Sequence, residues 1–179
     1  MKILHTLHNK ERGFSQFELV VVIILISILA SIALNRIWGW RNEVEHTLIQ
    51  AVSGNIRSAL GLETAQLALQ NKLDQLSKLA GSNPFSLLAQ KPDNYLGELS
   101  DTNPNTKQQG IWYYSKEQRV LIYTIKYSQS FKSTLTGQPR IRFKIKLIYS
   151  DNNHNRRYDP NVDAIAGLNF LALDKYQWD

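Results

Sequence analysis

Residues 19–34 read LVVVIILISILASIAL. Ser27 and Ser31 are the only polar residues in this run, and Glu18 is the only charged residue between positions 14 and 34. The 21 residues 14–34, at about 1.5 Å per helical residue, span roughly 30 Å, which is the thickness of a bilayer core. The stretch therefore predicts a single membrane-spanning helix.

The residues on either side of this stretch predict its orientation. Basic residues precede it and also alternate with two tryptophans that follow it: Lys2, Lys10 and Arg12, then Arg36, Trp38, Trp40 and Arg41. A basic leader favours a cytoplasmic N-terminus, and long domains translocate regardless of their own charge. We therefore expect a single-pass inner-membrane protein whose C-terminal part lies in the periplasm.

Two ordinary kinds of segment compete with this interpretation. One is a secretory signal peptide cut after the small-x-small motif of residues 31–33, and the other is a plain signal anchor. Neither explains Glu18, because a carboxylate costs about 2.5–3.5 kcal/mol when it is carried to the centre of a bilayer. Glu18 is therefore a candidate functional residue that needs a partner.

The residues around Glu18 also carry a family resemblance. Residues 13–18 read GFSQFE, and together with the basic leader and the apolar run they resemble the type IV prepilin signature. That family comprises type IV pilins, minor pilins and the pseudopilins of type II secretion. The resemblance implies that prepilin peptidase cleaves between Gly13 and Phe14 and methylates the new amine of Phe14. It also implies that Glu18 pairs with the N-terminal amine of a neighbouring subunit, which would offset the cost of burying its charge.

A second resemblance lies in the middle of the chain. Residues 83–98, NPFSLLAQKPDNYLGE, and residues 110–123, GIWYYSKEQRVLIY, are similar to a stretch of minor pilins of the mannose-sensitive haemagglutinin type. The chain has no cysteine, so the C-terminal disulfide loop of many adhesive major pilins cannot form. The resemblance implies a minor pilin, and the absence of cysteine favours a minor pilin or a pseudopilin.

The rest of the chain predicts an α+β fold. Apolar residues recur at helical spacing over residues 36–80, which predicts one long helix to about residue 65 and a second over about 64–80. A short helix capped by Asn83 follows. Four strands are expected, over residues 110–115, 119–127, 140–150 and 165–173. The expected parts are a leader (1–13), an assembly helix (14–35), a periplasmic helical segment (36–80) and a globular domain (81–179). The resemblance implies that the long helix packs on an antiparallel sheet of about four strands.

Residues 151–163, DNNHNRRYDPNVD, contain a partial calcium-loop pattern. Oxygen-bearing side chains occupy positions one, three, five and nine of that template, with a carboxylate just past position twelve: Asp151, Asn153, Asn155, Asp159 and Asp163. Arg156 stands where the template has glycine, and Val162 stands where it has glutamate. The alternatives are a Ca²⁺ site and a polar loop between two strands, where Asn and Asp are favoured by turn chemistry.

The charge distribution leaves a nucleic-acid role open but offers no catalytic centre. The chain has 21 Lys and Arg against 15 Asp and Glu, a net charge of +6. Residues 118–150 contain no acidic residue, and Arg140, Arg142, Lys144 and Lys146 alternate with apolar residues on one strand. Such a face binds DNA phosphates in some proteins, but a solvated outer face explains it more simply. No nucleophile–base motif or phosphate-binding glycine loop occurs, so we do not expect an enzyme.

Taken together, the sequence predicts a minor pilin, a structural subunit of a type IV pilus-like filament. Its expected partners are prepilin peptidase, other pilin subunits through the N-terminal helix, and the inner membrane. A type II secretion pseudopilin is the close alternative. An alternative of another class is a membrane-anchored or secreted periplasmic binding domain that does not polymerise.

Overall fold

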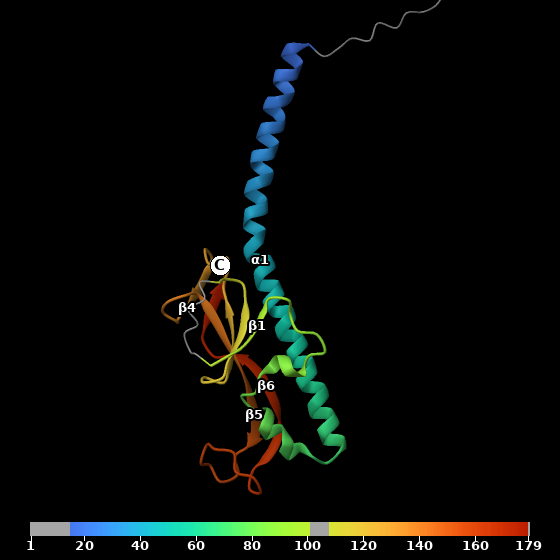
Figure 1. Ribbon diagram of the computed structural model, residues 1–179, viewed down its shortest axis with the longest axis vertical. Helices are drawn as coiled ribbons and strands as arrows, with labels where there is room; N and C mark the ends of the chain where they lie inside the picture. Colours follow the sequence, from blue (N-terminus) through green and yellow to red (C-terminus); the bar gives the residue numbers. More distant parts are fainter. Residues whose placement is uncertain (1–14, 101–107, 179) are drawn as a thin grey trace, which may run out of the picture. The chain divides into compact units, whose positions relative to one another are not determined.

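The computed structural model describes residues 15–100 and 108–178. The predicted cleavage site, Gly13 and Phe14, lies outside the described residues. The chain divides into two compact units, residues 1–41 and 42–179. Helix α1, Gln16–Leu69, contributes to both of them (Figure 1).

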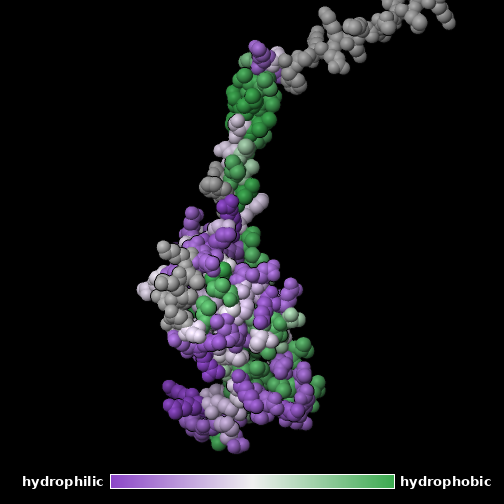
Figure 2. Space-filling view, viewed as in Figure 1, coloured by the Kyte–Doolittle hydropathy of each residue, from purple (hydrophilic) through white to green (hydrophobic). Residues whose placement is uncertain are grey.

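The first unit contains the predicted apolar helix. Residues Gln16–Leu34 form a helix that is long and apolar enough to cross a membrane, and none of this stretch is buried within the chain. Figure 2 shows its surface as mostly hydrophobic, with hydrophilic residues at its N-terminal end. The structure therefore confirms an N-terminal apolar helix of membrane-spanning length.

The second unit is α+β, with a mixed sheet of five strands in the order β1-β2-β3-β5-β6. The strands are β1 (Tyr95–Leu99), β2 (Trp112–Ser115), β3 (Val120–Thr124), β5 (Arg140–Ser150) and β6 (Ala164–Ala172). A separate two-stranded sheet joins β4 (Phe131–Ser133) to β7 (Tyr176–Trp178). The α+β class is confirmed, and each of the four predicted strands corresponds to one of β2, β3, β5 and β6.

The sheet differs from the expected antiparallel one at β1, which pairs parallel with β2. Parallel neighbours need a crossover connection of a dozen or more residues, and residues 100–111 between the two strands supply that length. The sequence did not predict β1, because this strand follows a segment rich in Pro, Asn and Asp and itself contains Gly97, whose φ is +109°. The sheet is therefore mixed.

The end of α1 also differs from the expectation. Instead of a second helix over residues 64–80, α1 continues to Leu69 and short turns follow, η1 (Leu73–Gln75) and α2 (Leu76–Leu79). Asn71 adopts a left-handed φ of 56°, and the N–H of Lys72 donates to the carbonyl of Leu67 at 2.9 Å. This is a Schellman stop, in which Asn takes the place that Gly usually occupies. The predicted capped turn is present as η2 (Pro84–Leu87), where the Asn83 side chain accepts the N–H of Phe85.

The core of the second unit lies between α1 and one face of the sheet (Figure 1). Ile49, Ile56 and Leu60 of α1 are buried in one cluster with aromatic side chains from the strands. Trp112 is central to that cluster, with its ring centroid 4.8 Å from that of Tyr123. Burial of each large aliphatic side chain stabilises the fold by about 1.5–3 kcal/mol. The packing of α1 on the sheet therefore determines which face of α1 is exposed to solvent.

Candidate functional site

Glu18 lies in the first turn of α1, three residues after Ser15, which caps the helix. Its backbone N–H donates to the hydroxyl of Ser15 at 3.2 Å, and the N–H of Leu19 donates to the Ser15 carbonyl at 3.0 Å. Ser15 and Glu18 therefore have the S-x-x-E spacing of a capping box. This is a role that the sequence analysis missed, and it is separate from any role of the Glu18 charge.

A second exposed surface lies on the part of α1 that belongs to the globular unit. Four large apolar side chains on it are exposed: Val44 by 56%, Leu48 by 60%, Leu62 by 71% and Leu69 by 87%. Val44, Ala51 and Ala65 are separated by multiples of seven residues, as are Leu48, Leu62 and Leu69, and the polar residues Asn55 and Ser58 occupy the remaining positions of these two rows. A mean interval of 3.5 residues is the pattern of a helix that packs against another helix. We call these six apolar residues the outer stripe.

Two glycines border the outer stripe. A Cβ atom built on Gly54 or Gly61 would meet nothing within 4 Å. Both residues lie inside α1, where Gly is about 1 kcal/mol less favourable than Ala. Packing within this chain therefore does not explain them, whereas the close approach of a second helix would.

The predicted calcium ligands all lie in the loop between β5 and β6, residues 151–163, which we call the β5–β6 loop. The Asp151 carboxylate accepts the backbone N–H of Asn155 at 3.1 Å and of Arg156 at 2.7 Å. The carboxylate of Asp163, which is buried, accepts the N–H of Asn152 at 2.9 Å and of Asp159 at 2.8 Å. Two carboxylates thus hold the loop closed through its own backbone.

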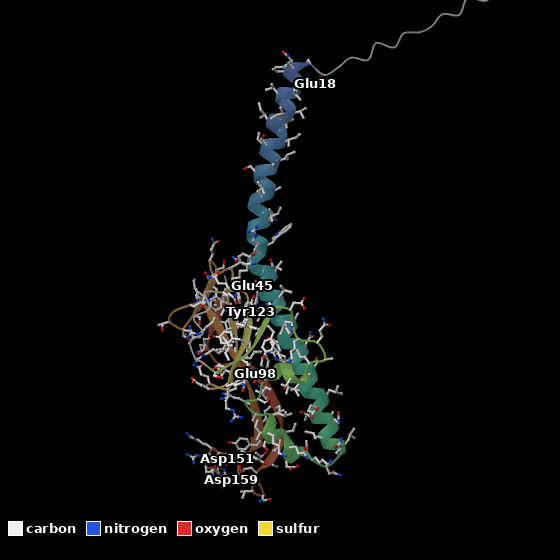
Figure 3. All side chains as sticks on the ribbon, viewed as in Figure 1. Glu18, Glu45, Glu98, Tyr123, Asp151 and Asp159 are labelled. Carbon is white, nitrogen blue, oxygen red and sulfur yellow. The ribbon has the colours of Figure 1, made fainter. Side chains whose placement is uncertain are left out.

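Asp159 is the third carboxylate of this loop. It accepts the side-chain NH₂ groups of Asn153 at 2.7 Å and of Asn155 at 2.5 Å. These two hydrogen bonds, Asn153 first, lower the pKa of Asp159, and the charge of Arg157 lowers it further. Figure 3 shows Asp151 and Asp159 in the same loop.

The loop fits Ca²⁺ in part. All five predicted ligands are gathered in it, and Arg156 adopts a left-handed φ of 63° at the template position usually held by glycine. However, Asn153 and Asn155 present amide nitrogens to Asp159, so both amides would have to rotate before their oxygens could bind a cation. In residues 15–100 and 108–178, no three His, Asp or Glu side chains are close enough to share a metal.

The basic residues of β5 share one face of the sheet, as predicted. Their side chains alternate with Ile141, Phe143 and Ile145, which are buried on the other face. Arg142 forms a two-pronged ion pair with Asp174, at 2.6 and 2.8 Å, and this contact raises the pKa of Arg142. Arg140 donates to the carbonyls of Thr136 and Gln138. Two of the four cations are therefore engaged within the domain, which weakens the argument for DNA.

The fold and these surfaces define an α+β domain that follows an apolar helix of membrane-spanning length. No family model, curated protein or solved structure matches the chain. The functional argument therefore rests on the chain's own residues.

Proposed function

We propose that this chain is a structural subunit, most like a minor pilin, of a type IV pilus-like filament. Prepilin peptidase removes residues 1–13 and methylates Phe14. Before assembly, the N-terminal helix of the mature chain is embedded in the inner membrane and its globular domain lies in the periplasm. Assembly then packs α1 against the helices of other subunits. The chain is a structural component and not an enzyme.

The observation that carries this proposal is that α1 exposes apolar surface far beyond the length of a membrane span. Residues 16–34 are unburied, and the outer stripe adds exposed apolar side chains at both ends of the α1 segment that packs on the sheet, Val44 and Leu48 at one end and Leu62 and Leu69 at the other. A plain membrane anchor needs only the first of these surfaces. A helix that joins a bundle of helices needs both, because exposed apolar stripes of this length mark interaction surfaces.

Glu18 supplies axial register in this proposal. A single carboxylate beside an apolar run gains most by pairing with an ammonium group, and the amine of a neighbouring Phe14 is such a group. Two apolar helices can pack at many axial positions, but this ion pair can form at only one of them. The pair therefore selects a single axial register.

Two substitutions separate this role from the capping box. Glu18→Val removes both the charge and the hydrogen-bonding side chain at the Glu position of a capping box, whereas Glu18→Gln keeps the S-x-x-Q spacing and removes only the charge. Both variants keep the observed Ser15 cap, because it uses the backbone N–H of residue 18. We expect normal cleavage and membrane insertion for both variants, with filament incorporation of each reduced at least about tenfold, the effect of losing a charged partner worth ~1.4 kcal/mol. Normal incorporation of Glu18→Gln would mean that the charge of Glu18 has no role in assembly.

A type II secretion pseudopilin is the close alternative, and it uses the same helix. Deleting the gene separates the two, because a pilin is needed for surface filaments and a pseudopilin for the release of secreted proteins. A secreted or membrane-anchored binding domain is the alternative from another class. In that case neither Glu18 variant would change the location or the partners of the chain.

A second proposal concerns the β5–β6 loop, which would hold Ca²⁺ through Asp151, Asn153, Asn155, Asp159 and Asp163. The observation in its favour is that all five lie in one loop closed by backbone-to-carboxylate hydrogen bonds. An ion there would replace the amide contacts of Asp159 and make the loop more rigid.

A further inference from the structure

The β5–β6 loop exposes one histidine and two arginines. His154, Arg156 and Arg157 are exposed, and in the described part of the chain neither guanidinium forms an ion pair or a hydrogen bond. The loop carboxylates are instead occupied by backbone N–H groups and by Asn side chains. We call these three residues the loop tip.

The backbone of the loop tip is held in a conformation that favours glycine. His154 and Arg156 have φ values of 60° and 63°, in the left-handed region that non-glycine residues rarely adopt. Asp151 stabilises this shape by accepting the N–H of Arg156. Nothing within the described chain is gained by having arginine at this position, so its benefit is expected in a contact with another molecule.

The surroundings of the loop tip favour a protein partner over a nucleic acid. Val162 of the same loop and Ile148 of β5 are exposed, and the rings of Tyr149 and Tyr158 are in edge contact at 5.6 Å. Arg and Tyr side chains are enriched at the residues that contribute most to protein–protein binding. Strong binding of a nucleic acid needs a longer series of phosphate contacts, and Arg140 and Arg142 of β5 are already engaged.

A complementary surface lies at the other end of the same unit. Glu43 lies in α1, one residue after the start of this unit at Asn42. Its side chain is exposed and has no partner among the described residues. Val44 beside it is exposed as well. Figure 3 shows Glu45, two residues further on, at the end of the unit remote from Asp151 and Asp159. The planar guanidinium group of an arginine can donate two hydrogen bonds to an exposed carboxylate such as that of Glu43.

We propose that the loop tip of one copy docks on Glu43 and Val44 of a second copy. The two surfaces are different and lie at opposite ends of one unit, so the contact is head-to-tail and can repeat from copy to copy, as it does in a filament. This inference rests on the proposed filament function, which requires such a repeating contact. It adds the partner and the residues through which the globular units meet.

Cysteine cross-linking tests the contact directly, because the chain has no cysteine of its own. The full chain carrying Glu43→Cys and Arg157→Cys is expressed in its native membrane and oxidised mildly. We expect a ladder of disulfide-linked oligomers. The control pair Glu117→Cys and Arg157→Cys uses an equally exposed acidic position elsewhere on the domain, and it should give no ladder. Absence of a ladder from the first pair overturns the proposal.

Charge exchange tests the chemistry of the contact. Self-association of the full chain, followed by co-purification of two differently tagged copies, should fall about fivefold with Arg156→Glu plus Arg157→Glu, and likewise with Glu43→Arg, as expected for exposed ion pairs. Mixing those two variants should restore association to within about twofold, as coupled sites require. No recovery on mixing contradicts a direct pair. Loss of duplex DNA binding in the arginine variant, with self-association intact, would overturn the proposal in favour of a nucleic-acid partner.

Two measurements on the same membranes, filament incorporation of Glu18→Gln and cysteine cross-linking, distinguish failure of this inference from failure of the proposed function. If Glu18→Gln abolishes filament incorporation while the cysteine pair gives no ladder, the filament role stands and the end-to-end contact is wrong. If Glu18→Gln has no effect and the ladder is absent, both are wrong.

Discussion

The carboxylate of Glu45 accepts a hydrogen bond of 2.8 Å from the hydroxyl of Tyr123, across the seam between α1 and the sheet (Figure 3). It also accepts the backbone N–H groups of Lys126 and Tyr127, at 2.7 and 2.8 Å. Glu45 is only 4% exposed. A buried charge is tolerated where several donors satisfy it, so this residue fixes the rotation of α1 and hence the direction of the outer stripe.

Replacing Glu45 should therefore destabilise the domain. In Glu45→Gln an NH₂ group replaces one acceptor oxygen and meets a donor, which leaves a buried group unsatisfied and costs about 1–3 kcal/mol. Denaturant unfolding of the full chain in detergent measures the change. Glu43→Gln is the matched control, because Glu43 is exposed, and it should stay within about 0.5 kcal/mol of the parent. Equal effects of the two substitutions would contradict the role of Glu45.

Alkaline pH should weaken the same contact. Burial, followed by the hydrogen bond to Glu45, raises the pKa of Tyr123 above its ordinary value of 10.0. The folded state therefore binds the phenolic proton more tightly than the unfolded state, so its stability is complete below pH 10.0 and is lost as the pH rises further. Unfolding measured against pH should show this loss, and Tyr123→Phe should reduce it. An unchanged profile in Tyr123→Phe would exclude this tyrosine as the cause.

The helix glycines should show opposite effects on stability and assembly. Gly54→Ala and Gly61→Ala add a Cβ that meets nothing within 4 Å, so each should stabilise the single chain by up to about 1 kcal/mol. The same methyl groups would obstruct the close approach of a second helix, so filament incorporation should fall. Lys78→Ala, at an exposed position outside α1, should change neither property. Greater stability with undiminished incorporation would show that no helix packs there.

Calcium should stabilise the domain if the β5–β6 loop binds it. Ca²⁺ present at 100 times its dissociation constant adds about 2.7 kcal/mol, which raises the melting temperature by several degrees. Mg²⁺ should have much less effect, because it requires a tighter octahedral shell. Asp151→Ala should abolish the calcium effect. A melting temperature that responds neither to calcium nor to chelator would reduce the segment to a polar interstrand loop.

The sequence predicted those parts of the fold that depend on local pattern. The apolar run, the alternation of β5 and the Asn83 cap each follow from the residues of one segment. The parallel strand β1 depends on a partner beyond a 12-residue connection, so no local pattern marks it. The stop at Asn71 was missed because Gly is the usual residue at a left-handed helix stop and the apolar spacing continues past Asn71.

The candidate site was predictable to the same limited extent. Glu18 is evident as a lone charge, whereas its cap contact with Ser15 needed coordinates. The outer stripe is recognisable only when the buried face of α1 is known, because apolar residues recur on both faces of the helix. Glu45 resembles any surface glutamate in the sequence, and only its three donors identify it as structural.

The central claim is that this chain is processed as a prepilin, and the N-terminus of the mature protein tests it most directly. Mass spectrometry of the protein from its own membranes should find a chain that begins at Phe14 and carries one methyl group on its amine. A chain that begins at Leu34 would indicate a secretory signal peptide, and an intact Met1 would indicate a plain anchor. Either of these results would contradict the account.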